Sequence, residues 1–193
     1  MKKCKCHTST ALGFRDWKPF QECAEERFET IPQEQGVYCF RIGKGDITKL
    51  KKIKSAFRES PLVTAFDKMR IVSEKVSKAS NQLFNDCGLG QEWGLKFPNY
   101  AEALEYDLNG IDELPGNDGC PILYIGASDS LRERIKNVME WKHPLSVPLW
   151  AFLYSGWTIQ VGVRSITDNW NEEAKIKREY KTDHRKLPFI VKR

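Results

Sequence analysis

Three short segments carry the pattern of β-strands, and their small number and wide spacing limit the possible folds more than any other feature of the chain. β-Branched and aromatic residues form a run between glycines at 36–42, and a second run at 122–125 ends at a glycine. Apolar and polar residues alternate at 157–164, which is typical of a half-buried strand. Three such strands make a small sheet that needs helices to cover its apolar side chains.

Helical patterns lie between and around these segments. Apolar side chains recur at steps of three and four over 62–83, the clearest periodic signal in the chain. Ser130 followed by Glu133 forms a capping box, so we expect a helix to begin there. Further helices are expected at 169–181 and, in shorter form, near 19–28. The sequence therefore predicts an α+β fold with a small, three-stranded, mostly antiparallel sheet flanked by helices.

The long interval between the first two strand patterns indicates an insertion. We expect an N-terminal lead-in at 1–35, a core formed by 36–42 and 120–193, and a largely helical insertion at 43–119. The second part of the insertion, 86–119, is rich in Gly, Asn, Asp and Pro, which is typical of a loop with at most a short helix. A length of 193 residues fits one domain with such an insertion.

The net charge of +5 is unevenly distributed. Residues 44–58 and 175–193 are basic, whereas 86–119 between them is acidic. Charge separation of this kind favours a surface that binds a polyanion, although each basic block can equally be the solvated face of a helix. The candidate nucleic-acid-binding residues are Lys51, Lys52, Lys54, Lys177, Arg178 and Lys181.

The cysteine pattern and the absence of long apolar runs give expectations about compartment. No apolar segment follows the basic N-terminus, and no run approaches the roughly 20 residues of a membrane span. We therefore expect a cytoplasmic protein with reduced thiols and no membrane partner. Cys4, Cys6 and His7 with the distant Cys23 can be drawn as a zinc site. Structural zinc usually uses two closely spaced pairs of ligands, and only one pair exists here, so thiols without a structural role are the favoured interpretation.

Two tripeptides on the first two strand patterns give a more specific signal. Gly36-Val37-Tyr38 and Tyr124-Ile125-Gly126 resemble the two halves of the GIY-YIG endonuclease signature. The resemblance covers 31–42 and 122–190, and the long segment between the two halves is similar to the insertions of restriction-type members. The downstream residues that match the family's pattern are Arg134, Glu173, Ile176 and Tyr180.

The resemblance implies a metal-dependent endonuclease that hydrolyses phosphodiester bonds in double-stranded DNA with Mg²⁺ or Mn²⁺ as cofactor. It implies that Tyr38 orders or activates the water and that Arg134 stabilises the charge on the phosphoryl group. It further implies that Glu173 holds the metal. Tyr124 and His143 complete the expected catalytic set.

These residue types suit the chemistry independently of the resemblance. A guanidinium donates two parallel hydrogen bonds to phosphate oxygens and stays charged at any working pH. One carboxylate is enough for Mg²⁺, which keeps several of its waters. A tyrosine with an ordinary pKa of about 10 needs a nearby cation before it can act as a base near neutral pH.

Structural roles for the same residues stay open. The side chains of Tyr38 and Tyr124 can simply pack on the sheet. Arg134 lies at the border of the apolar stripe of its helix, and this position suits a structural arginine as well as an arginine that lines a cleft. His143 follows a helix end, so contact with the helix dipole explains it as well as catalysis does.

Two adjacent carboxylates compete for the metal. If Asn169 caps the last helix, Glu172 falls at the third helical position, where a carboxylate has a local capping role. Glu173 has no such role and shares a side of the helix with Tyr180. We therefore favour Glu173.

Two other functions stay open. Ile190 stands where the family typically has Asn, which favours a catalytically weak nucleic-acid-binding module on the same scaffold. The amphipathic segment 62–83 and the acidic loop favour a protein-interaction domain. RNA as substrate, the recognition sequence and the biological role also stay open, as does the oligomeric state, with a dimer as one option because a double-strand cut needs two sites or sequential nicking.

Overall fold

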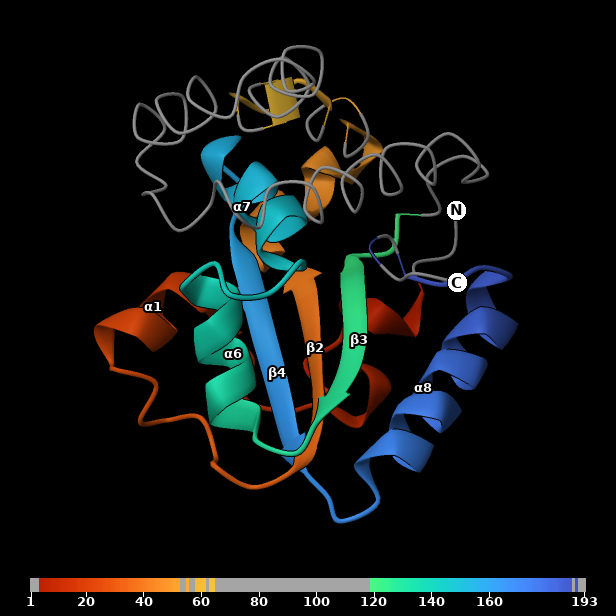
Figure 1. Ribbon diagram of the computed structural model, residues 1–193. Helices are drawn as coiled ribbons and strands as arrows, with labels where there is room; N and C mark the ends of the chain where they lie inside the picture. Colours follow the sequence, from red (N-terminus) through yellow and green to blue (C-terminus); the bar gives the residue numbers. More distant parts are fainter. Residues whose placement is uncertain are drawn as a thin grey trace, which may run out of the picture.

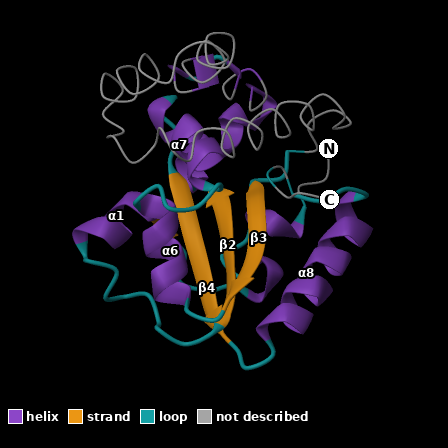
Figure 2. Cartoon of the chain, in the orientation of Figure 1, coloured by secondary structure: helices purple, strands orange, loops and turns teal. Residues whose placement is uncertain are grey.

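The computed structural model describes residues 4–52, 55, 58–61, 63–64, 119–188 and 190. These residues form an α+β fold in which helices pack on a four-stranded antiparallel sheet with the strand order β1-β4-β2-β3. Figure 2 shows the neighbouring strands β4, β2 and β3 with the helices around them. The α+β class and the antiparallel pairing agree with the expectation from the sequence. The strands are β1 (Lys18–Pro19), β2 (Gly36–Ile42), β3 (Ile122–Ser128) and β4 (Ile159–Ser165).

The expectation of three strands is wrong by one, because the lead-in supplies β1. Lys18 pairs with Val161 of β4, and Pro19 pairs with Gln160. A two-residue strand that contains a proline shows no alternation, so the sequence carries no signal for it. The lead-in is part of the folded core, since it also contributes the fully buried side chain of Phe20.

β2 lies in the middle of the sheet and pairs along its length with both β3 and β4. Its register with β3 shifts after Phe40, which pairs with Tyr124, whereas the next residue of β2 pairs with Ile122. Leu123 is the extra residue of this bulge, and both Leu123 and Tyr124 pack in the same hydrophobic cluster. Tyr124 lies on the face of the sheet that carries Tyr38 because it pairs with Phe40, and the bulge turns Leu123 towards that face as well.

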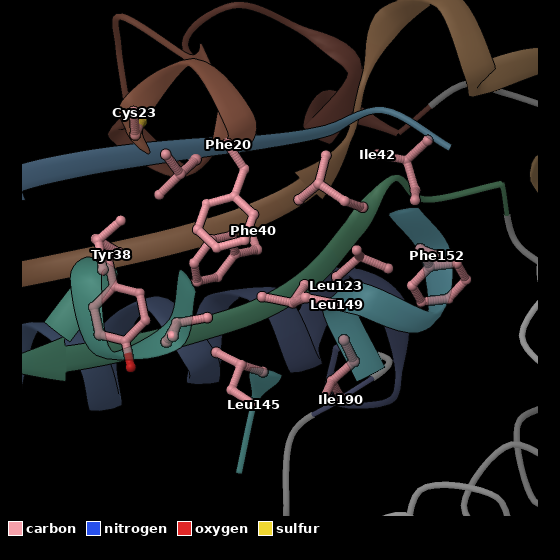
Figure 3. Packing of buried hydrophobic residues seen from close by; sticks show 14 of the residues in the cluster. Phe20, Cys23, Tyr38, Phe40, Ile42, Leu123, Leu145, Leu149, Phe152 and Ile190 are labelled. Carbon is pink, nitrogen blue, oxygen red and sulfur yellow. The ribbon is translucent and has the colours of Figure 1, made fainter. Parts of the chain in front are cut away.

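Helices cover both faces of the sheet (Figure 1). α1, α6 and α7 cover the face with Tyr38 and Phe40, and their buried side chains form one core with it (Figure 3). α8 runs beside β3 and packs, with the N-terminal segment, on the opposite face. The helices are α1 (Phe20–Glu25), α6 (Leu131–Met139), α7 (Ser146–Tyr154) and α8 (Asn169–His184), and the short 3-10 segments are η1 (Lys5–His7), η2 (Ala11–Gly13) and η3 (Lys44–Lys52).

The helix starting signals behave as expected at α6. The hydroxyl of Ser130 accepts a hydrogen bond from the backbone N–H of Glu133, which is the contact that a capping box predicts. The sequence did not predict α7. Its own side chains are apolar on almost every side of the helix, so they show no helical period. Pro148 lies in the first turn of α7, where its missing N–H has no partner to lose. No helix in the described part of the chain is long and apolar enough to cross a membrane.

The two ends of the insertion meet at the end of the sheet. The backbone N–H of Ile42 donates to the carbonyl of Pro121 at 2.8 Å. Early parts of the insertion pack on the core, where Leu50 and Val63 are buried. The expected helix at 62–83, apart from its first positions, and the acidic loop lie outside the described residues.

Candidate functional site

The two motif tyrosines stack on one face of the sheet. The ring centroids of Tyr38 and Tyr124 are 5.8 Å apart with an interplanar angle of 27°. Tyr38 is only 1% exposed, and its hydroxyl points away from Phe20 and Phe40 at one end of the core (Figure 3). Tyr124 is half-buried. The ring of Tyr38 thus packs the sheet, and only its hydroxyl is directed towards a site.

Close approach explains the two glycines of the motif. Gly126 pairs with Tyr38, and a Cβ at Gly126 would lie 2.5 Å from Cε1 of Tyr124 and 2.7 Å from Cζ of Tyr38. A Cβ at Gly36 would lie 2.2 Å from the carbonyl oxygen of Arg164. Each glycine therefore leaves space that another group fills.

Burial raises the pKa of Tyr38 well above its ordinary value of 10, and the electrostatic interaction and hydrogen bond with Tyr124 raise it further. The Arg134 guanidinium acts in the opposite direction, whereas the Glu173 carboxylate adds to the rise. The nearby cation required for a basic Tyr38 is present, but burial outweighs it. Tyr38 is therefore a protonated phenol near neutral pH, which can donate a hydrogen bond and cannot readily take a proton.

Arg134 is a half-buried cation on α6 without a protein partner among the described residues. Its charge acts on Tyr38 and on His143, but its guanidinium forms no hydrogen bond or ion pair within the part of the chain that the structure describes. The neighbouring Arg132, in contrast, has hydrogen-bond partners within the protein. Arg132 donates to the carbonyl of Ile31 at 2.8 Å and to a second backbone oxygen. Within the described part of the chain, no protein group occupies the donors of Arg134, so they can bind a ligand.

Glu173 lies on α8 with its side chain 13% exposed. One carboxylate oxygen forms an ion pair with Lys177, one turn further along the helix, and the other has no partner among the described residues. Its charge reaches Tyr38. The charges of Arg134 and Glu173 therefore both act on Tyr38, which stacks on Tyr124, and the charge of Arg134 also acts on His143.

Glu172 has a different task from the one expected. The residue that precedes the helix is Asp168, not Asn169, and no side chain caps it. The Glu172 carboxylate instead pairs with Arg164 of β4 at 2.5 Å, so it holds α8 to the sheet. The capping role was wrong, but Glu172 still has a structural function and leaves Glu173 as the carboxylate beside Tyr38.

The hydrogen bond that the structure shows for the His143 ring is to the start of the helix that follows it. Its Nδ1 accepts the backbone N–H of Leu145 at 3.1 Å, just before α7. Burial and the charge of Arg134 lower the pKa of His143 to about 4, so the ring is neutral at pH 7. With Nδ1 as acceptor, the proton lies on Nε2, which is a hydrogen-bond donor.

The carboxylate of Glu173 fits a hard divalent ion. Mg²⁺ takes oxygen ligands, often one or two carboxylates, and completes its shell with waters. Glu173 supplies one half-buried carboxylate with one oxygen unpaired within the described region. We therefore regard Glu173 as the residue that would hold Mg²⁺ or Mn²⁺.

The expected nucleic-acid-binding residues are not equivalent. Lys52, Arg178 and Lys181 are exposed. Lys177 is half-buried against Glu173. The side chain of Lys51 and the whole of Lys54 lie outside the described residues.

Asn169 is a positioning residue that sequence reasoning missed. It is 3% exposed, and its Nδ2 donates to the carbonyl of Ser128 at 2.9 Å and to the carboxylate of Asp129 at 3.2 Å. These bonds join the end of β3 to the start of α8. The sequence suggested a helix cap at this asparagine but not its bond to another strand.

Ile190 is a core residue. It is buried, and its backbone N–H donates to the carbonyl of Leu123 at 2.8 Å. The side chain that replaces the expected Asn therefore packs in the core beside β3.

A second group of chemically reactive side chains lies on the opposite face of the sheet. The ligand atoms of Cys4, Cys6, Cys120 and His184 all lie within 4.8 Å of one another. The alternative zinc set with Cys23, which the sequence did not favour, does not form, because Cys23 is buried in the core on the other face of the sheet and donates to the carbonyl of Pro19.

Comparison of the chain with protein-family models, curated proteins and solved structures returns no match.

Proposed function

We propose that the chain is a metal-dependent endonuclease of the GIY-YIG type that hydrolyses phosphodiester bonds in DNA. The single observation that carries the proposal is the guanidinium of Arg134, a half-buried cation beside Tyr38 with no anionic partner among the described residues. Partly burying an unpaired charge is unfavourable, so such a position favours an external anion. A phosphate diester matches the planar fork of a guanidinium.

The other groups of the site are mainly hydrogen-bond donors. Tyr38 is a neutral phenol that, with Tyr124, would order the attacking water. Nε2–H of His143 would donate to a phosphate oxygen, since Nδ1 is occupied by the backbone. Preorganised donors of this kind stabilise charge that develops on the phosphoryl oxygens in the transition state.

Glu173 supplies the negative charge needed to hold a divalent cation. A metal ion bound there would polarise the phosphate and lower the pKa of a coordinated water. Lys177 lies beside the same carboxylate and balances its charge in the metal-free protein.

A second candidate function is a nucleic-acid-binding module that does not cleave. One specific observation favours it: neither Tyr38, with its raised pKa, nor His143, with Nε2 protonated, is ready to take a proton from water. The exposed cations Lys52, Arg178 and Lys181 serve both candidates, because phosphate contacts dominate affinity in either case.

The test is incubation of the full chain with supercoiled plasmid and Mg²⁺, alongside Arg134→Ala and Glu173→Gln. Lys136→Ala is the matched control, since Lys136 is a half-buried cation on the same helix as Arg134. Cleavage that the two site variants lose and the control keeps supports the endonuclease. Equal cleavage by all proteins contradicts the site assignment. Binding without cleavage supports the second candidate, and neither binding nor cleavage contradicts both.

A further inference from the structure

Three remote parts of the chain bring four metal-ligating side chains together. Cys4 and Cys6 come from the segment around η1, Cys120 precedes β3, and His184 is the last residue of α8. Their three sulfur atoms and one ring nitrogen all lie within 4.8 Å of one another. Sγ of Cys6 lies 3.4 Å from Nε2 of His184.

We propose that Cys4, Cys6, Cys120 and His184 form a structural zinc site. Tetrahedral zinc with three thiolates and one imidazole places neighbouring ligand atoms about 3.4–3.8 Å apart, given Zn–S near 2.3 Å and Zn–N near 2.0 Å. The observed separations need only a small inward movement to reach that geometry. Thiolate and imidazole ligands select zinc over Mg²⁺, which requires oxygen.

The surroundings of the four residues support the side-chain orientations that a metal needs. The ring of Tyr180 stacks on the ring of His184, with centroids 4.2 Å apart and an interplanar angle of 21°. The hydroxyl of Tyr180 donates to Sγ of Cys120 at 3.3 Å. Contacts of this kind around the ligands fix ring orientation and tune the sulfur.

The four side chains are buried enough for a structural metal site, and two of them are exposed enough for the metal to enter. Cys6 and Cys120 are 3% and 7% exposed, whereas Cys4 and His184 are half-buried. Four protein ligands leave no open position on a tetrahedral ion, which distinguishes a structural site from a catalytic one.

Zinc here would join the N-terminal segment, the start of β3 and the end of α8. The same helix carries Glu173 nearer its beginning, so the metal would fix the element that positions the candidate active site. The zinc proposal does not depend on the endonuclease proposal, since its three cysteines belong to the hydrophobic cluster on the face of the sheet opposite Tyr38 and its chemistry is thiolate coordination.

The first experiment measures metal content and coordination in the full chain. Protein purified under reducing conditions without chelators is expected to contain one zinc per chain by elemental analysis. After zinc is removed and replaced with Co²⁺, the visible spectrum should show intense tetrahedral d–d bands and thiolate-to-cobalt charge transfer. A chain that keeps neither zinc nor cobalt after dialysis, or that shows only the weak spectrum of octahedral cobalt, overturns the proposal.

Variants then assign the ligands. Cys120→Ser and His184→Ala should lose the metal, whereas Cys23→Ser should keep it, because Cys23 is an equally buried thiol outside the group. Metal retained by both ligand variants contradicts the assignment.

A measurement on the unmodified chain keeps the proposal testable if the variants fail to fold. Chelation should lower the unfolding temperature, and added ZnCl₂ should restore it. All six cysteines should react as thiols once the metal is removed and the chain is denatured. An unfolding temperature that zinc does not change, or a thiol count reduced by a disulfide among Cys4, Cys6 and Cys120, overturns the proposal.

Discussion

The Tyr38 ring of β2 lies over Gly126 of β3, in the space that a side chain at Gly126 would fill. The two residues are cross-strand partners, and a Cβ at Gly126 would lie 2.7 Å from Cζ and 2.8 Å from the hydroxyl oxygen of Tyr38. The same Cβ would meet the ring of Tyr124. One missing side chain thus allows both phenols to occupy the site.

Gly126→Ala should therefore destabilise the fold by about 1–3 kcal/mol, the usual cost of overpacking, and displace both tyrosines. Urea unfolding measures the first effect, and plasmid cleavage the second. Gly45→Ala is the control, because a Cβ at Gly45 meets no atom within 4 Å. Similar losses in both variants would show that the steric argument is wrong.

Arg134→Ala should lower cleavage by about 10²–10³-fold, the typical effect of removing one donor that stabilises transition-state charge. The unfolding temperature should stay constant or rise, since Arg134 has no protein partner in the described structure to lose. Arg134→Lys keeps the charge without the planar fork and should give an intermediate rate. A large fall in stability for Arg134→Ala would instead indicate a structural arginine.

Glu173→Gln and Glu172→Gln should separate chemistry from stability. The two carboxylates have similar exposure, 13% and 17%. Glu173→Gln should abolish cleavage at any Mg²⁺ concentration that serves the unmodified chain. Its cost in stability should be small, because an i,i+4 ion pair contributes only about 0.3–0.5 kcal/mol.

Glu172→Gln should keep cleavage but destabilise the fold by about 1–3 kcal/mol, because it weakens a charged hydrogen bond to Arg164. Nε of Arg164 is already buried without a partner in the described region, which makes the remaining bond important. Loss of cleavage in Glu172→Gln with unchanged stability would contradict this assignment and indicate that Glu172, not Glu173, holds the metal.

His143 should make stability depend on pH in the acid range. Its pKa is lowered from 6.5 to about 4 on folding, so the unfolded chain binds this proton more tightly than the folded chain. The contribution is complete above about pH 7 and is lost as the pH falls through about 6.5 to about 4, with a total of up to about 3 kcal/mol.

His143→Asn, whose amide oxygen can still accept the Leu145 N–H, should remove this part of the pH dependence. The free energy of urea unfolding at pH 7.5 and pH 5 measures it. An equal drop in both proteins would assign the acid sensitivity to other groups.

Arg178→Ala and Lys181→Ala should weaken DNA binding for all sequences alike. Each should also reduce the slope of log affinity against log salt by about 0.9 for every phosphate that the protein no longer neutralises. Both residues are exposed on α8. Lys177→Ala should leave the slope nearly unchanged, because Lys177 is paired with Glu173. Unchanged slopes in the first two variants would place the binding surface elsewhere.

The helices and strands that short sequence patterns indicate were predicted correctly. The glycine-bounded run at β2, the capping contact of Ser130 and the last helix all appear where the sequence placed them. The site residues were identified by resemblance, and the structure places Arg134 and Glu173 within electrostatic reach of Tyr38.

The missing parts depend on contacts that no local pattern records. The direction of the Tyr38 pKa follows from burial in a core built from distant segments. The thiol of Cys6 and the ring of His184 meet although they are 178 residues apart in the chain. The acceptor role of His143 depends on where α7 begins, and α7 itself is too uniformly apolar to show a helical period.

The hydrogen bond between Ile42 and Pro121 has a consequence for how this protein can change over evolution. The chain leaves the sheet and returns to it at adjoining positions, so the register of β2 and β3 is set by the strands and not by the length of what lies between them. Lengthening a closed loop costs little free energy. The sheet that carries the candidate site and the intervening segment can therefore diverge at different rates, and the segment can be exchanged without changing the strand register that positions the candidate site.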